Sequence, residues 1–78
     1  MNDWLSQRAD VLARASGVDR ASLELDPAQI EALLDIAGFA AHDSGARTNA
    51  PLLCYLIGRA EGGASFEELA EAVRTSSS

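Results

Sequence analysis

Four sets of helix start signals divide this 78-residue sequence, and they constrain its fold more than any other feature. Two of them are capping boxes, in which an N-cap side chain and the side chain three residues later each bind the other's backbone N–H. Asp26 pairs in this way with Gln29, and Ser65 with Glu68. Apolar residues recur at helical spacing after each start, and no useful stretch alternates with the period of a half-buried strand. The sequence therefore predicts an all-α fold, a compact bundle of four short helices.

The boundaries of these helices follow from caps and stops. We expect starts at Asn2 or Asp3, at Asp26, at Thr48 or Asn49 and at Ser65, and stops at Gly17, near Asp43, and at Gly62 and Gly63. The composition predicts a polar linker between the first two helices. The second and third helices should form an antiparallel pair across a short turn. Residues 1–78 make a single helical domain at most, with residues 1–2 and 75–78 frayed.

The second predicted helix is apolar on nearly every side, with a polar strip of Glu31, Asp35 and His42. Such a helix is buried between neighbours or against another chain. We therefore expect an exposed apolar surface that docks on a protein partner or forms a homo-oligomer, and we assign it to Trp4, Ile36 and Phe39. On this interpretation the protein is a non-catalytic interaction module.

The charge balance excludes several classes of partner. The chain has a formal net charge of −6, contains no lysine, and spreads its six arginines along the sequence. It should bind neither nucleic acid nor an anionic membrane, and a basic protein surface is the more natural partner. The sequence lacks a long apolar run and a signal-peptide pattern, and Cys54 has no second cysteine to pair with, so we expect a cytoplasmic protein.

Arg8 stands within the apolar stripe of the first predicted helix. Its methylene stem could cover the core while the guanidinium reaches water. The alternative is a structural ion pair with Asp35 or Glu31 across the interface of two helices. In either case the arginine has a structural role, and we assign the ion pair to Arg8 and Asp35.

A group of polar residues near the second turn is the alternative functional site. His42, Arg47, Tyr55 and Arg59 could bind an anionic pterin or nucleotide near the start of the third helix. His42 could equally satisfy the free carbonyls at the end of its own helix. No serine or cysteine has the partners of a catalytic nucleophile, and the acidic strip has no zinc-ligand spacing. We expect no catalysis, no metal and no cofactor.

Residues 33–63 also carry a short pattern in which a helix ends in Ala-His and, after a turn, Ala-Pro-Leu opens an apolar helix that contains Leu-x-Gly. The matching residues are Ala41 and His42, then Ala50, Pro51 and Leu52, then Leu56 and Gly58. The sequence resembles a small actinobacterial domain family of unknown function, whose members occur alone or as a C-terminal extension of molybdenum cofactor guanylyltransferase. The resemblance implies an accessory role in molybdenum cofactor (molybdopterin guanine dinucleotide) biosynthesis, with that transferase as a possible partner. It implies no chemistry, because the transferase's glycine-rich nucleotide loop has no counterpart here.

Overall fold

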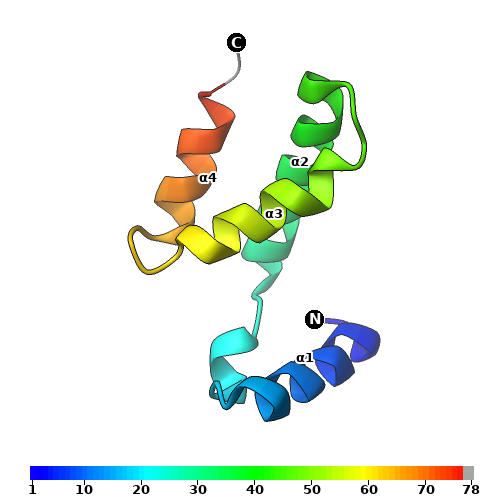
Figure 1. The fold of residues 1–78 in the computed structure, drawn as a ribbon, viewed down its shortest axis with the longest axis vertical. Helices are drawn as coiled ribbons and strands as arrows, with labels where there is room; N and C mark the ends of the chain where they lie inside the picture. The colour runs from blue at the N-terminus through cyan, green and yellow to red at the C-terminus, as the bar shows by residue number, and fades with distance from the viewer. Residues whose placement is uncertain (77–78) are drawn as a thin grey trace. The chain divides into compact units, whose positions relative to one another are not determined.

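The structure, a computed structural model, describes residues 1–76. These residues form four α-helices and one short 3-10 helix, and they contain no β-strand (Figure 1). The elements are α1 (Asp3–Ser16), η1 (Arg20–Leu23), α2 (Pro27–Ser44), α3 (Asn49–Ala60) and α4 (Phe66–Arg74). The predicted all-α fold and the positions of its four helices are confirmed. The fraying predicted for residues 77–78 lies outside the described residues.

The chain forms two units, Met1–Ile30 and Glu31–Ser78, each held by its own contacts. In the N-terminal unit, α1 begins where the Asn2 side chain accepts a hydrogen bond from the Leu5 N–H at 2.9 Å. It ends at Gly17, whose φ of 76° is the left-handed conformation that glycine adopts without strain. Both boundaries agree with the sequence prediction.

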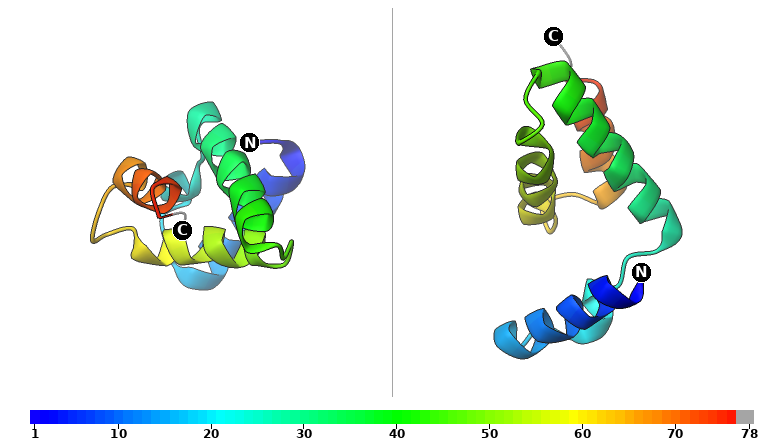
Figure 2. Two further views of the ribbon diagram at one scale, coloured as in Figure 1. Left: turned by 90° about the horizontal axis from the view of Figure 1, so that it is seen from above. Right: turned by 90° about the vertical axis from the view of Figure 1, so that its right-hand side faces the viewer.

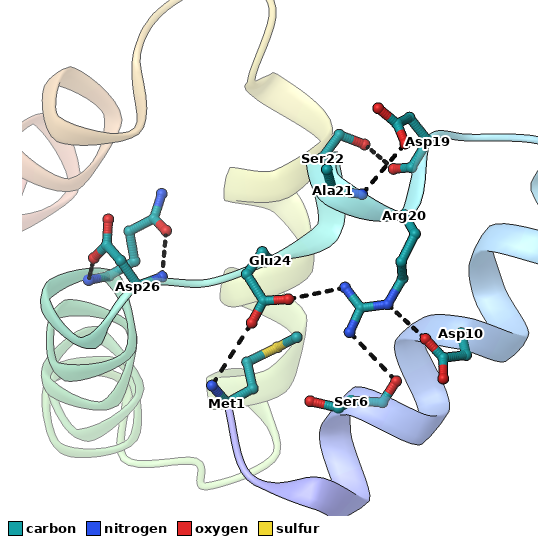
Figure 3. A network of polar contacts seen from close by, with 10 residues as sticks. Met1, Ser6, Asp10, Asp19, Arg20, Ala21, Ser22, Glu24 and Asp26 are labelled. Atoms are coloured by element: carbon teal, nitrogen blue, oxygen red, sulfur yellow. Dashed lines mark hydrogen bonds and ion pairs between the residues drawn. The ribbon is translucent and has the colours of Figure 1, made fainter.

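Arg20 connects η1 to α1 within the N-terminal unit (Figure 3). Its Nε lies 2.7 Å from Oδ1 of Asp10 on α1, its Nη1 lies 3.0 Å from Oε2 of Glu24, and its Nη2 donates to the Ser6 carbonyl at 3.5 Å. The hydrogen bond with Asp10 is the largest cause that raises the pKa of Arg20 above its ordinary value. This cluster orders η1, where the sequence had predicted only a polar linker.

The apolar stripe of α1 is present but is not buried. Trp4 is 63% exposed and Leu12 is 60% exposed, while Ala9 is buried. Within the N-terminal unit only the four-residue η1 packs against α1, and it is too short to cover a 14-residue helix. The stripe therefore remains a surface of this unit instead of a core.

The core of the C-terminal unit takes one buried residue from each of three helices. Ile36 of α2, Ile57 of α3 and Ala70 of α4 form the cluster, and Leu53, Cys54, Phe66, Leu69 and Val73 pack against it. Figures 1 and 2 show that α3 runs obliquely across α2 and does not lie antiparallel along it, as the sequence had suggested. An oblique crossing leaves parts of both helices uncovered beyond the point of contact.

Both predicted capping boxes are present. Asp26 Oδ1 accepts from the Gln29 N–H at 2.8 Å, and the Asp26 N–H donates to Gln29 Oε1 at 2.9 Å. Ser65 Oγ accepts from the Glu68 N–H, and the Ser65 N–H donates to Glu68 Oε1, both at 3.2 Å. At α3 the N-cap is Thr48, but its side chain makes no capping hydrogen bond.

The capping box of α4 gives the stability a defined dependence on pH. The Ser65 backbone N–H, and after it the Ser65 side chain, lowers the pKa of Glu68. A carboxylate whose pKa is lower in the folded state stabilises the fold above its unfolded pKa of about 4.3, and this contribution is lost as the pH falls through the folded pKa. The wild-type protein should therefore exceed Glu68→Gln in melting temperature at pH 7, and the gap should shrink below pH 4. Thermal unfolding followed by circular dichroism at several pH values measures this difference in melting temperature. A difference that does not change with pH would contradict the prediction.

Candidate functional site

An apolar groove lies between the C-terminal half of α2 and α3, entirely within the C-terminal unit. Its volume is about 390 Å³, and it is lined by Phe39, Ala40, Asp43, Ser44, Asn49, Leu52, Leu53 and Leu56. Five of these eight residues are apolar. The three polar residues come from the end of α2 and the start of α3. We call this feature the α2–α3 groove.

The turn between the two helices shapes this end of the groove. Ser44 Oγ donates to the Ala40 carbonyl at 2.5 Å and accepts from the Ala46 N–H at 3.2 Å. Gly45 follows in the left-handed conformation, with φ of 74°, which ends α2. The chain then reverses and begins α3 at Asn49, so the start of α3 lies beside the end of α2.

The groove borders an exposed helix face. Leu52 is 60% exposed, Tyr55 66% and Leu56 58%, and Arg59 is also exposed. The four residues stand at positions i, i+3, i+4 and i+7, which places them on one side of a helix. The Arg59 guanidinium carbon lies 5.9 Å from the centroid of the Tyr55 ring. We call these four residues the exposed α3 face.

Helical spacing predicts a single inward face for α3, made of Leu52, Leu53, Leu56, Ile57 and Ala60, and the structure divides this set. Leu53 and Ile57 face the core as predicted, whereas Leu52 and Leu56 are exposed, so their assignment to the inward face was wrong. Both pairs have the same four-residue spacing, so the sequence contains two adjacent leucine-rich stripes. The presence of two stripes was the signal that one of them could remain exposed.

The structure joins two of the four residues predicted to bind an anion. Tyr55 and Arg59 are in contact on α3, while His42 lies near the end of α2 and Arg47 in the turn, and all four are exposed. No hydrogen bond or ion pair within residues 1–76 connects His42 or Arg47 to the α3 pair. The four-residue anion site stays a prediction.

The predicted interface residues have different environments. Trp4 is exposed, and Phe39 is half-buried in the lining of the groove. Ile36 is fully buried in the core, so its assignment to an interface was wrong. Because α2 is apolar nearly all round, the sequence could not show which of its isoleucines and leucines the other helices would cover.

Arg8 contacts residues of its own helix. Its guanidinium carbon lies 5.1 Å from the centroid of the Trp4 ring, and its Nη2 donates to Gln7 Oε1 at 3.4 Å. The proposed partner, Asp35, belongs to the C-terminal unit. The ion pair of Arg8 with Asp35 stays a prediction.

Cys54 does not have the environment of a reactive thiol. It is half-buried beside the core, with Sγ 3.9 Å from the Leu33 carbonyl oxygen, and burial raises its pKa. A raised pKa reduces the fraction of thiolate, which is the nucleophilic form. Among residues 1–76, no three His, Cys, Asp or Glu side chains are grouped to hold a metal ion, and no helix there is long and apolar enough to cross a bilayer.

Comparison with protein-family models gives one match. A model described as "Domain of unknown function (DUF6457)" matches residues 1–78, the entire sequence. Neither the curated proteins nor the solved structures gave a match.

Proposed function

We propose that this chain, which belongs to the DUF6457 family of domains of unknown function, is a non-catalytic protein-interaction module. The observation that carries the proposal is the exposure of Leu52 and Leu56 beside an apolar groove. Single exposed leucines are ordinary on protein surfaces, but a continuous apolar patch next to a concave one is typical of an interaction site. A partner would cover the exposed α3 face and insert an apolar side chain into the groove.

The polar lining of the groove supports binding over catalysis. The Ser44 hydroxyl donates its proton to the Ala40 carbonyl, so it is committed to closing the turn. Asp43 and Asn49 lie at the same end of the groove. A nucleophile needs a base within hydrogen-bond reach to remove its proton, and Ser44 has a backbone carbonyl in that position. These polar groups suit the rim of a binding site, which orients a partner.

The context we propose is molybdenum cofactor biosynthesis in the cytoplasm, in actinobacteria. It rests on the resemblance of residues 33–63 to domains that extend molybdenum cofactor guanylyltransferase. The formal charge of −6 favours a partner with a basic surface. The guanylyltransferase, or another enzyme that acts on the same cofactor, is therefore the partner to look for.

The proposal is tested by pull-down at low salt, where attraction between charged surfaces is least screened. Three baits are compared: the wild-type chain, Leu56→Asp, and the matched control Leu34→Asp. Leu34 is a 69% exposed leucine of the same unit that does not line the groove. We expect the wild type and Leu34→Asp to retain a molybdenum cofactor enzyme, and Leu56→Asp to lose it by about 30-fold, as for a binding hot spot.

Two results would count against this function. If both aspartate variants lost the partner equally, binding would depend on charge and not on the groove. If Leu56→Asp captured every protein that the wild type captures, the groove would not be a partner site. Recovery of an unrelated enzyme, lost only with Leu56→Asp, would leave the interaction module in place and remove the molybdenum context.

A further inference from the structure

The exposed α3 face has the pattern of a helix that pairs with another helix. Its residues Leu52, Tyr55, Leu56 and Arg59 follow the i, i+3, i+4, i+7 spacing of a packing seam, and the three apolar members are each more than half exposed. The core stripe of the same helix, Leu53 and Ile57, is already used within the C-terminal unit. This second apolar stripe on α3 is available to pack against a second helix.

We propose that this neighbour is a second copy of the chain, and that two α3 helices pack antiparallel across a two-fold axis. The inference rests on the proposed function in one respect, since it names what occupies the proposed interaction surface in the isolated protein. A two-fold interface uses the same patch on both copies, so the patch must be complementary to itself. The exposed α3 face and the groove lining together meet this requirement, through Arg59 of the face and Asp43 of the lining.

The exposed α3 face and the adjoining groove lining carry opposite charges at their two ends. Arg59 lies at the C-terminal end of α3, and Asp43 lies in the groove lining beside Asn49, at the N-terminal end. When Leu52 faces the second copy's Leu56, an antiparallel arrangement brings Arg59 level with the second copy's Asn49 and hence near its Asp43. The contact occurs twice, once on each side of the axis. A parallel arrangement would instead place the two Arg59 side chains together, where like charges repel.

The size of the face sets the expected strength of the dimer. A 12-residue helix is about 18 Å long and about 10 Å wide, so two such helices in contact bury less area than a standard interface. Stable interfaces usually bury about 1,200–2,000 Å², and smaller ones belong to weak, exchanging complexes. We therefore expect a dimer that forms in the micromolar range or above. Such a dimer can dissociate when a partner protein binds the same face.

The test uses the purified full-length chain and two charge-reversed variants, Arg59→Glu and Asp43→Arg. Each variant alone places like charges opposite each other at both contacts, so we expect its homodimer to be about tenfold weaker than the wild type. An equal mixture of the two variants restores opposite charges at both contacts of the heterodimer. Sedimentation equilibrium at about 0.15 M salt, which screens the repulsion between two copies of formal charge −6, measures the association. Native mass spectrometry separates heterodimer from homodimers by mass. The expected result is recovery of near wild-type association in the mixture, as heterodimer.

A second variant makes the test independent of the charges. Leu52→Asp should abolish association up to millimolar protein, while Leu34→Asp should associate like the wild type, and unchanged far-ultraviolet circular dichroism shows that both are folded. A wild-type chain that is monomeric at 1 mM would overturn the proposal, as would a dimer that is unaffected by Leu52→Asp. Neither result bears on the pull-down, because a monomer can still bind a partner through the groove. A dimer without any captured partner would remove the proposed function and leave this inference standing.

Discussion

Replacing Ile36 by alanine is expected to lower the free energy of unfolding of the C-terminal unit by about 2–5 kcal/mol. Ile36 has no exposed surface and packs in one cluster with Ile57 and Ala70. The loss combines the transfer of the removed carbon atoms with the cavity left among three helices that cannot fully close around it. Because small domains are stable by only about 5–15 kcal/mol, the variant should unfold at much lower urea concentration. Urea denaturation followed by circular dichroism at 222 nm measures the change.

The matched control is Leu34→Ala, two residues away on the same helix. Leu34 is 69% exposed, so its truncation should change the free energy of unfolding by less than about 0.5 kcal/mol. Both substitutions introduce alanine into α2, so helix propensity contributes little to the difference between them. Equal losses from the two variants would show that α2 is buried on a different side, and the assignment of the core would then be wrong.

The helix boundaries could be predicted because the signals that set them are local. The Asp26–Gln29 and Ser65–Glu68 capping boxes each lie within four residues, and Gly17 ends α1 through its own backbone conformation. Neither kind of signal depends on how the helices pack. The short helix η1 was missed because the Arg20 side chain holds it in place by reaching residues as far away as Ser6 and Asp10.

The choice of buried face could not be predicted, because it depends on where neighbouring helices cross. On α2, the apolar residues surround the helix, and packing by α3 and α4 buries Ile36 while Leu34 stays exposed. On α3, the stripe with Leu53 and Ile57 packs in the core, while the adjacent stripe with Leu52 and Leu56 stays exposed. Hydrophobic periodicity identifies such stripes but does not rank them.

The candidate site shows the same limit. Phe39 was predicted as an interface residue and lines the groove, but Leu52 and Leu56, expected on the inward face of α3, also line it and are exposed. The only histidine and the only tyrosine of the sequence lie near this turn, which is why a site was predicted there. In the structure, the α2–α3 groove lies beside the same turn. His42, Arg47, Tyr55 and Arg59 were therefore predicted near the same turn that the groove borders, and whether they bind an anion stays a prediction.

Replacing Ala70 by leucine is expected to lower the free energy of unfolding by about 1–3 kcal/mol. Ala70 is 3% exposed and lies where α4 packs on α3 and on the core, so the three additional carbon atoms have no free volume to occupy. The helices must separate, or the new side chain must leave its preferred rotamer. Ala72→Leu is the matched control, since it makes the same substitution at an exposed position of α4. It should change the stability by less than about 0.5 kcal/mol.

A double variant then tests whether the cost comes from crowding in this particular cluster. Ile57→Ala alone should be destabilising by about 2–5 kcal/mol because it leaves a cavity beside Ala70. Combining it with Ala70→Leu moves side-chain volume from α3 to α4 while keeping the total nearly constant, and cores tolerate such exchanges better than either change alone. The double variant should therefore lose less free energy of unfolding than the two single variants lose together, by about 1 kcal/mol or more. Strict additivity in urea denaturation would mean that the two residues do not share a packing site, and that α4 packs against α3 elsewhere.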